Sequence, residues 1–289
     1  MYKPNDCYID LDLPLPITAE ELFDEDDIEF IESDDDALKN PKYSHSFKTT
    51  NMSWSIPPTG PSPDGTIGYL TNQDIADELH RYYNEHFTVN ALADSLTNYP
   101  EPFTIVKFHK SSRWHKEGGN EWHNDIDSRE VFKSRFPYAF NFALYGDVED
   151  SSVLFGVPAE ELVQEEKYLE QKIVNKHRSR VANGLPFNNS LPISKVTGRR
   201  MQARSKKYDF SVYMGRAGFS SDKDESEMIT TKLKREGNYG PFIINVGQWH
   251  RVITNNMARV TLRFMGGTNY TFNELEDLHA NKQLLVQDT

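Results

Sequence analysis

Residues 103–125 read FTIVKFHKSSRWHKEGGNEWHND, and this stretch decides which fold we expect. It begins with a run of aromatic and β-branched residues, FTIVKF, that is typical of a strand, and Gly118-Gly119 then marks a turn. The triplet His123-Asn124-Asp125 follows on what we expect to be a second strand. Residues i and i+2 of a strand point the same way, so His123 and Asp125 can aim at a common metal ion while Asn124 faces away. The stretch therefore predicts a β-sheet that carries part of a metal site.

Two segments far downstream complete the pattern. Residues 247–252 read GQWHRV and hold His250, and residues 258–262 read ARVTL and hold Arg259. Two histidines and one carboxylate can occupy one face of an octahedral iron(II) and leave three positions open for a co-substrate and dioxygen. An arginine nine positions beyond His250 supplies a planar, permanently charged fork for a carboxylate. The predicted metal ligands, which are also the predicted catalytic residues, are His123, Asp125 and His250.

These motifs resemble those of the iron(II)/2-oxoglutarate-dependent dioxygenase superfamily. The likeness lies in TIVKFH, the glycine turn and WHND of the first segment, and in WHRV and ARVTL of the second. It covers roughly residues 100–155 and 236–267, under a third of the chain. The resemblance implies a mainly β fold with flanking helices around a double-stranded β-helix (jelly-roll) core.

The resemblance also implies a chemistry, hydroxylation of a substrate carbon. 2-Oxoglutarate would chelate Fe(2+) through its keto and C1 carboxylate oxygens, and O2 would take the last open position when the substrate arrives. Decarboxylation would leave an iron(IV)-oxo that abstracts hydrogen from substrate; the cofactor does this chemistry and the protein orients it. A carboxylate retained at Asp125 indicates hydroxylation or desaturation, because related halogenases need that position vacant for a halide.

Residues 259–264 predict a binding site for the co-substrate. Alternation along a strand places Arg259, Thr261 and Arg263 on one face and the apolar residues on the other. Two arginines and a threonine facing a barrel interior are costly without an anion, and a bound dicarboxylate removes that cost. We expect Arg259 on the distal carboxylate, with Arg263 as the alternative. The predicted cofactor-binding residues are Arg259, Thr261, Asn141 and Tyr145, the last two on the strand that follows the HND triplet.

Other interpretations of these residues stay open. His115-Lys116-Glu117 is a second triplet of this kind, but its charged, Gly-flanked surroundings are typical of a solvent-exposed loop. Zinc also accepts two histidines and a carboxylate, and a zinc-dependent hydrolase is a second candidate. However, the chain lacks the glutamate of an HExxH arrangement that would serve as general base, and a zinc site does not explain Arg259. A third candidate is a non-catalytic jelly-roll binding module, against which the intact triad argues.

Composition limits the class of protein. At 289 residues the chain can bury a sizeable core, and 37% hydrophobic with 12% aromatic residues indicates a globular protein. A net charge of −12 argues against general affinity for nucleic acid or anionic membranes. Cys7 is the single cysteine, which excludes an internal disulfide and is typical of a cytoplasmic protein. No window approaches the about 20 apolar residues of a membrane span.

We expect an acidic N-terminal arm at 1–40 and a single oxygenase domain at 41–289. In the arm, Thr18-Ala19-Glu20-Glu21 is typical of a capping box that opens a short helix. The domain is expected to hold a loop at 54–65, a helical buttress at about 70–98, jelly-roll halves at about 101–156 and 205–267, and an insertion at about 157–204 that begins with a helix. Strands are predicted at 103–108, 138–145, 152–156, 193–196, 208–214, 242–246 and 259–264.

A basic run at 195–207 is the one sequence feature that bears on the substrate. It holds Arg199, Arg200 and Arg204, lies between the two metal-binding segments, and contrasts with an acidic protein. It is either a solvated loop or a lid that clamps an anion. Because aromatic residues are absent from it, a single-stranded nucleic-acid platform is not favoured. We therefore expect a small polar or anionic metabolite, such as an amino acid or nucleotide derivative, with a peptide or protein side chain as the alternative.

Overall fold

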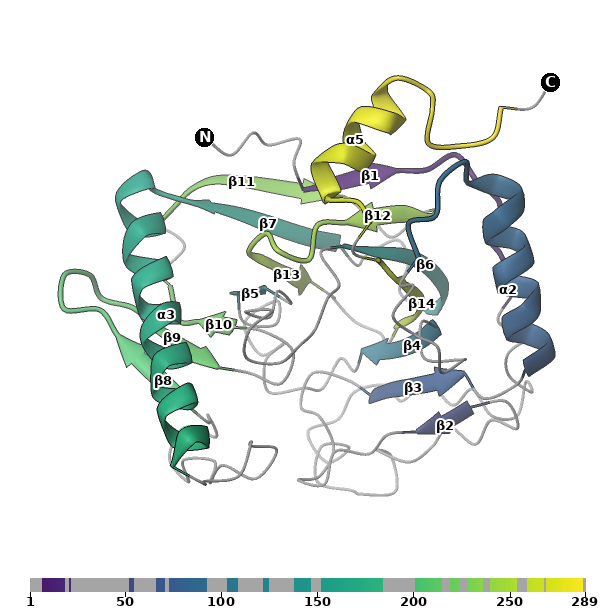
Figure 1. Cartoon of the computed structure of the whole chain (residues 1–289). Helices are drawn as coiled ribbons and strands as arrows, with labels where there is room; N and C mark the ends of the chain where they lie inside the picture. The colour runs from purple at the N-terminus through teal and green to yellow at the C-terminus, as the bar shows by residue number, and fades with distance from the viewer. Residues whose placement is uncertain are drawn as a thin grey trace.

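The computed structural model describes the core of the chain with gaps between its elements. The described residues are 7–18, 21, 52–54, 66–70, 73–92, 103–108, 122–124, 138–146, 152–183, 201–214, 219–223, 228–235, 240–253, 259–267 and 269–287. Within them the protein is mainly β, with strands in two antiparallel sheets and helices packed outside them (Figure 1).

The first sheet has the order β1-β12-β6-β14-β4-β3-β2, and each neighbouring pair is antiparallel. Its strands are β1 (Tyr8–Asp10), β12 (Phe242–Ile244), β6 (Ala139–Gly146), β14 (Arg259–Met265), β4 (Phe103–Phe108), β3 (Thr66–Leu70) and β2 (Met52–Trp54).

The second sheet has the order β11-β7-β13-β5-β10-β9-β8, also antiparallel throughout. Its strands are β11 (Ile229–Arg235), β7 (Ser152–Pro158), β13 (His250–Ile253), β5 (Trp122–Asn124), β10 (Phe219–Ser221), β9 (Ser211–Met214) and β8 (Met201–Arg204).

Four of these pairings nest inside one another along the chain. β4 pairs with β14, β5 with β13, β6 with β12 and β7 with β11. They are the rungs of one long antiparallel ribbon, whose two arms are β4 to β7 and β11 to β14. Successive strands of each arm lie in alternate sheets, because β4 and β6 belong to the first sheet and β5 and β7 to the second. The ribbon therefore winds around the space between the sheets and brings residues distant in sequence to neighbouring strands.

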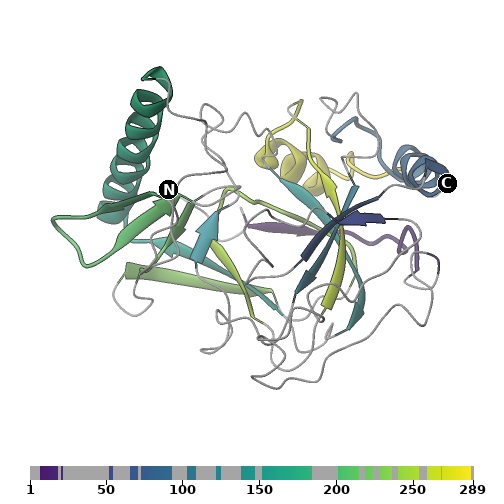
Figure 2. The same ribbon diagram turned by 90° about the horizontal axis from the view of Figure 1, so that it is seen from below.

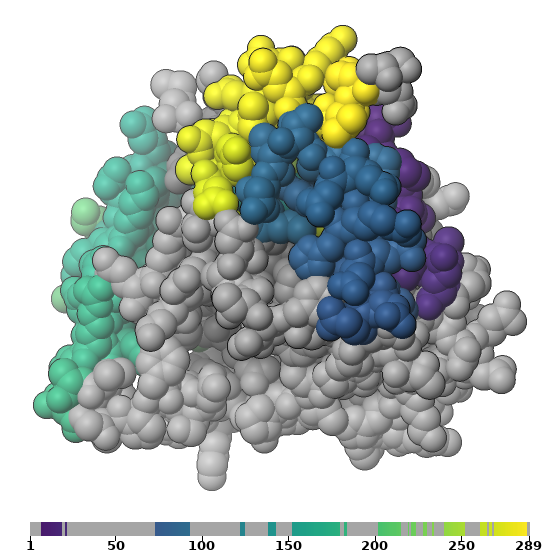
Figure 3. Space-filling model, turned by 45° about the vertical axis from the view of Figure 1, so that its right-hand side comes forward, coloured from purple at the N-terminus to yellow at the C-terminus, as the bar shows by residue number. Residues whose placement is uncertain are grey.

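Helices cover the outer faces of the two sheets. α2 (Gln73–His86) and α5 (Phe272–Ala280) lie over the first sheet, where Leu79 and Leu275 pack against Phe140 and Phe264. α3 (Glu160–Ala182) lies on the opposite side of the molecule, over the second sheet (Figures 1 and 2). On the α2 side, residues 7–18 and the C-terminal segment adjoin α2 (Figure 3).

A separate apolar cluster fills the space between the sheets. It combines Ala139 and Phe242 of the first sheet with Val153 and Phe155 of the second, together with Cys7, Ile244 and Val246. Alternation along β6 explains the division, since Ala139 faces this interior while Phe140 faces α2. The sheets thus enclose an interior, and alternate residues of each strand line it.

Most of the predicted elements are confirmed. Strands occur in the predicted ranges from 103, 138, 152, 208, 242 and 259, and helices occur at 73–86 and 160–182. Thr18 and Glu21 make both reciprocal bonds of the predicted capping box. The strand expected at 193–196 and most of the acidic arm lie outside the described residues. No described helix combines the length and apolar content that a membrane crossing requires.

Several described elements were not predicted, namely the strands β1, β2, β3, β8, β10 and β11 and the helix α5. For α5 the sequence does hold a signal, because Thr271 and Glu274 form a capping box at its N-terminus. β3 follows a Pro- and Gly-rich stretch and is only five residues long, too short for its alternation of side chains to be recognised in the sequence. The end of the expected insertion, at 201–204, forms β8 and pairs with β9 at the edge of the second sheet.

Gly266 should tolerate no side chain. A Cβ at this position would lie 2.4 Å from Cδ2 of Tyr138 and 2.5 Å from its carbonyl oxygen, while nothing lies within 4 Å of a Cβ at Gly240, whose φ is +62°. We expect Gly266→Ala to lower the free energy of unfolding by about 3 kcal/mol, as overpacking does. Gly240→Ala should cost about 1 kcal/mol of backbone strain. Urea denaturation measures both, and equal losses would contradict the packing described here.

Candidate metal centre

His123 and His250 stand directly opposite each other on neighbouring antiparallel strands. His123 lies in the middle of β5, and His250 is the first residue of β13 and its register partner. Their ring centroids are 4.4 Å apart with an interplanar angle of 53°. His250 is 3% exposed, and Phe155 of the interior cluster is its partner on the other side, with ring centroids 6.1 Å apart. The two predicted histidine ligands therefore come together inside the space between the sheets.

The backbone before β13 orients His250. Its Nδ1 lies 2.7 Å from the carbonyl oxygen of Gln248, and because a carbonyl only accepts, Nδ1 carries the proton. This tautomer presents the lone pair of Nε2 to a metal, a common arrangement for metal-binding histidines. Gln248 is itself held, since its Nε2 donates to the carbonyl of Gly156 at 2.7 Å. The ring orientation thus depends on contacts between β13 and β7.

Asp125, the predicted carboxylate ligand, lies outside the described residues, immediately after the end of β5. The preceding residue behaves as predicted, because Asn124 faces away from the interior and lies on the α3 side of the sheet. Among the described side chains, no group of three histidine, cysteine or acidic residues could hold a metal ion. The described part of the site is therefore the histidine pair.

The alternation predicted for β14 is confirmed at residues 261–264. Leu262 and Phe264 belong to the outer cluster beneath α2, whereas Thr261 and Arg263 lie on the opposite face. Arg263 is the register partner of Asn141, which is buried. The Oγ1 of Thr261 is buried and, among the described residues, has no hydrogen-bond partner. A polar face therefore borders the interior on the first sheet, and it carries a hydroxyl that no described residue bonds.

Two further predicted co-substrate residues are described only by their backbones. Arg259 begins β14 opposite Phe108 of β4 and Gly146 of β6, and Tyr145 is opposite Val260. Their side chains lie outside the described residues.

The predicted substrate-binding arginines divide in the same way. Arg199 and Arg200 lie outside the described residues. Arg204 ends β8, with an exposed side chain 2.7 Å from the carboxylate of Asp209 in the following turn. β10 and β9 separate this edge strand from β5. The competing triplet at 115–117 is likewise not described.

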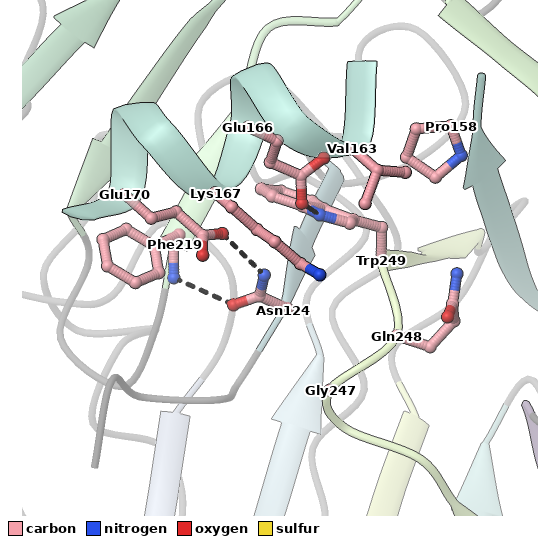
Figure 4. Close-up of a pocket in the computed structure, with 10 residues that line it drawn as sticks. All are labelled: Asn124, Pro158, Val163, Glu166, Lys167, Glu170, Phe219, Gly247, Gln248 and Trp249. Atoms are coloured by element: carbon pink, nitrogen blue, oxygen red, sulfur yellow. Dashed lines mark hydrogen bonds between the residues drawn. The ribbon is translucent and has the colours of Figure 1, made fainter. Parts of the chain in front are cut away.

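Sequence reasoning missed a buried polar cluster behind the strands that carry His123 and His250 (Figure 4). It lies between α3 and the outer face of the second sheet and combines Glu166, Glu170, Asn124 and Trp249, which Figure 4 shows, with Lys223, which is not drawn there. Lys223 forms an ion pair with Glu166 and lies 3.8 Å from the centroid of the Trp249 ring. A signal was available, because Glu166 and Glu170 are spaced three or four residues from Leu162, Leu169 and Ile173 and so share the apolar face of α3.

Burial changes the acidity of Glu170. Desolvation and then the neighbouring charge of Glu166 raise the pKa of this carboxyl from 4.5 to about 7, against the opposing effects of Lys223, Asn124 and Lys167. Glu170 lines a small pocket with Lys167 and Phe219, and its carboxylate points toward Asn124 (Figure 4).

Comparison with known proteins identifies no family. No family model matches the chain, and no curated protein matches it. Among solved structures, the X-ray structure of E. coli ycfD matches with a TM-score of 0.31 and 10% sequence identity. The match covers 95% of this chain and 53% of the ycfD chain. A likeness this low identifies neither a fold nor a function.

The raised pKa of Glu170 predicts a pH dependence of stability. Between pH 4.5 and about 7 the folded protein binds more protons at this carboxyl than the unfolded chain, so stability falls as pH rises through this window. Glu170→Gln removes the buried charge. The difference in free energy of unfolding, variant minus wild type, should therefore increase between pH 5 and pH 8. For a pKa shift of this size the increase should be at most about 3 kcal/mol. Urea denaturation across this range measures the difference, and a constant difference would contradict a buried charge at Glu170.

Proposed function

We propose that this chain is an iron(II)- and 2-oxoglutarate-dependent oxygenase that hydroxylates a small polar or anionic metabolite. The observation that carries the proposal is the cross-strand pair of His123 and His250, whose rings lie 4.4 Å apart in the interior. These are the two histidines that the sequence pattern selected from nine.

The strand order supports a double-stranded β-helix as the scaffold. The eight strands of the wound ribbon, numbered one to eight along the chain, occur in the order 6-3-8-1 in the first sheet and 5-4-7-2 in the second. Two sheets of this kind, wound from one folded ribbon, are the architecture of a jelly roll. The proposed ligands come from β5 and β13, which are neighbours in the second sheet, and from β14 of the first sheet.

The metal site would use both arms of the ribbon. His123 and Asp125 would come from β5 and the residue after it, and His250 from β13. The outward position of Asn124 supports this, because strand alternation places His123 on the interior face and would place Asp125 there too if the strand continued by one residue. Two histidines and a carboxylate on one face of iron(II) leave adjacent positions open, and His250 is already in the tautomer that offers Nε2.

The face of β14 fits an anionic co-substrate. Burying a hydroxyl without a partner is unfavourable, and the Oγ1 of Thr261 is such a group among the described residues. The hydroxyl would donate a hydrogen bond to a carboxylate oxygen of 2-oxoglutarate. Arg259 lies two residues earlier on the same strand and would supply the charged fork, with Asn141 on the neighbouring strand as a further donor.

Each residue then has a defined task. When bound with dioxygen, the metal and 2-oxoglutarate supply the oxidising power that hydroxylates a C–H bond. The histidines and Asp125 would hold the metal on one face, while Arg259 and Thr261 would fix the distal end of the co-substrate. Phe155, whose ring centroid lies 6.1 Å from that of His250, would form an apolar wall of the site.

Substrate selection is proposed to involve the basic run. Arg204 holds one end of it in β8, paired with Asp209, and Arg199 and Arg200 precede that strand. A cationic segment beside an acidic domain would favour an anionic metabolite. A peptide side chain is the competing substrate, which the turnover assay below separates.

The proposal is tested first by metal binding and turnover. Purified protein should bind about one equivalent of iron(II) under argon and, with 2-oxoglutarate, show a weak visible absorption band. Aerobic succinate formation should be stimulated by members of a panel of amino acids and nucleotide derivatives rather than by peptides. His123→Ala and Asp125→Ala should abolish turnover, and His80→Ala on α2 should not, because His80 lies far from the pair on the outer face of the first sheet. Full activity of either ligand variant, or turnover with zinc alone, would overturn the assignment.

The co-substrate site makes a second prediction. Arg259→Leu removes the charged fork and should weaken 2-oxoglutarate binding by about 2–5 kcal/mol, whereas Arg263→Leu should be much milder. Thr261→Val should weaken binding about three- to tenfold by loss of one hydrogen bond. Since the hydroxyl has no described partner in the protein, the valine variant should unfold at no lower temperature than the wild type. A milder effect of Arg259→Leu than of Arg263→Leu would show that the other arginine binds the co-substrate.

A further inference from the structure

α3 contacts both metal-binding strands from behind. Glu166 and Glu170 are one helical turn apart, so they lie on the same face of α3, toward the outer side of the second sheet (Figure 4). Each glutamate accepts a hydrogen bond from a residue next to one of the histidines. Glu170 accepts from Asn124, which follows His123, and Glu166 accepts from Trp249, which precedes His250. One helical turn therefore holds the two strands of the proposed metal site.

Asn124 links β5 to two other elements. Its Oδ1 accepts from the backbone N–H of Phe219 in β10 at 3.3 Å, and its Nδ2 donates to Oε1 of Glu170 at 3.4 Å. Because the backbone N–H can only donate, the amide oxygen must face Phe219 and the amide nitrogen must face Glu170. The side chain is thus held at both ends, which restricts rotation of β5 about its own axis.

Trp249 is held in a comparable way. Its Nε1 donates to Glu166, and its ring lies against the Nζ of Lys223, which is also the ion-pair partner of Glu166. Its carbonyl accepts from the N–H of Gly156 at 2.9 Å. The residue before His250 is therefore fixed by its side chain as well as by its backbone.

We propose that Glu166 and Glu170 are positioning residues that hold His123 and His250 in register for the metal, an inference that rests on the proposed function. In a strand, the side chain behind the sheet and the ligand in front of it are set by the same backbone rotation. Contacts behind ligating residues commonly alter metal affinity by about 10–100-fold.

Packing alone does not require this cluster. α3 already buries Leu162, Leu169 and Ile173 against the sheet. Burying two carboxylates and a lysine in the same interface is often no more stabilising than apolar residues of similar size, whereas hydrogen-bonded polar groups restrict the interface to one arrangement. The expected consequence is a defined position for the two strands rather than added stability.

The Asn124 contact is tested with Glu170→Leu, and Glu165→Leu is its matched control. Glu165 is a buried glutamate of the same helix, but its partner is Ser205 in the β8–β9 turn, at 2.8 Å. We expect Glu170→Leu to weaken iron(II) binding about tenfold or more and Glu165→Leu to leave it within about twofold. Glu170→Gln keeps a hydrogen-bond acceptor for Asn124 and should bind iron(II) as tightly as the wild type. Asn124→Ala should match Glu170→Leu, and the double variant should lose no more than either.

The Trp249 contact is tested with Trp249→Phe, which removes the N–H donor and retains an aromatic ring beside Lys223. Trp122→Phe is the matched control, because Trp122 is buried on the same side of the sheet and its Nε1 has no partner among the described residues. Trp249→Phe should weaken iron(II) binding about tenfold, and Trp122→Phe should change it by no more than about twofold.

Imidazole NMR signals of the metal-free protein separate this inference from the proposed function. Signals of His123 and His250 should shift in Glu170→Leu and Trp249→Phe and stay in place in Glu165→Leu, whether or not the wild type binds iron(II). Absence of iron binding by the wild type would defeat the proposed function alone. Unchanged histidine signals in folded Glu170→Leu and Trp249→Phe, or equal changes in Glu165→Leu, would overturn the positioning role.

Discussion

The antiparallel pairing of β5 with β13 is the constraint on which the rest of the structure depends. It sets His123 opposite His250 and is one rung of a ribbon whose other rungs join β4 to β14, β6 to β12 and β7 to β11. A strand has a period of two residues, so a slip of one position at this rung would turn a histidine outward. The neighbouring rungs resist such a slip, because they bury Phe155 and Phe242 in the same interior.

The same two strands present different chemistry on their two faces. Toward the interior they carry the histidines, and toward α3 lie Asn124 of β5 and Trp249, the residue before β13, which are hydrogen-bonded to Glu170 and Glu166. The outer contacts involve charges that are unfavourable to bury unless every member is paired. A polar layer behind a proposed metal site, and a threonine hydroxyl on the facing sheet without a partner among the described residues, both depart from simple apolar packing. Such departures are expected where a fold also serves a function.

Local patterns predicted much of this arrangement. The alternation of residues 261–264, the strand at 103–108 and the outward position of Asn124 follow from period-two geometry, which needs no knowledge of neighbours. β2 and β3 were missed because short strands beside proline and glycine lack a clear period. The cluster around Glu166 was missed for another reason, since burial of a charged helical residue depends on what docks against it.

The sequence by itself determined the types of residue available for chemistry and the parity with which each strand presents them. It could not determine which strands become neighbours, because strand pairing depends on the winding of the whole ribbon and on the burial that results. Only the tertiary structure brought the ring centroids of His123 and His250 to 4.4 Å from each other. It also placed one turn of α3 behind the strands that carry them. Alternation is a property of the local backbone, whereas proximity between distant segments comes from packing that involves the entire core.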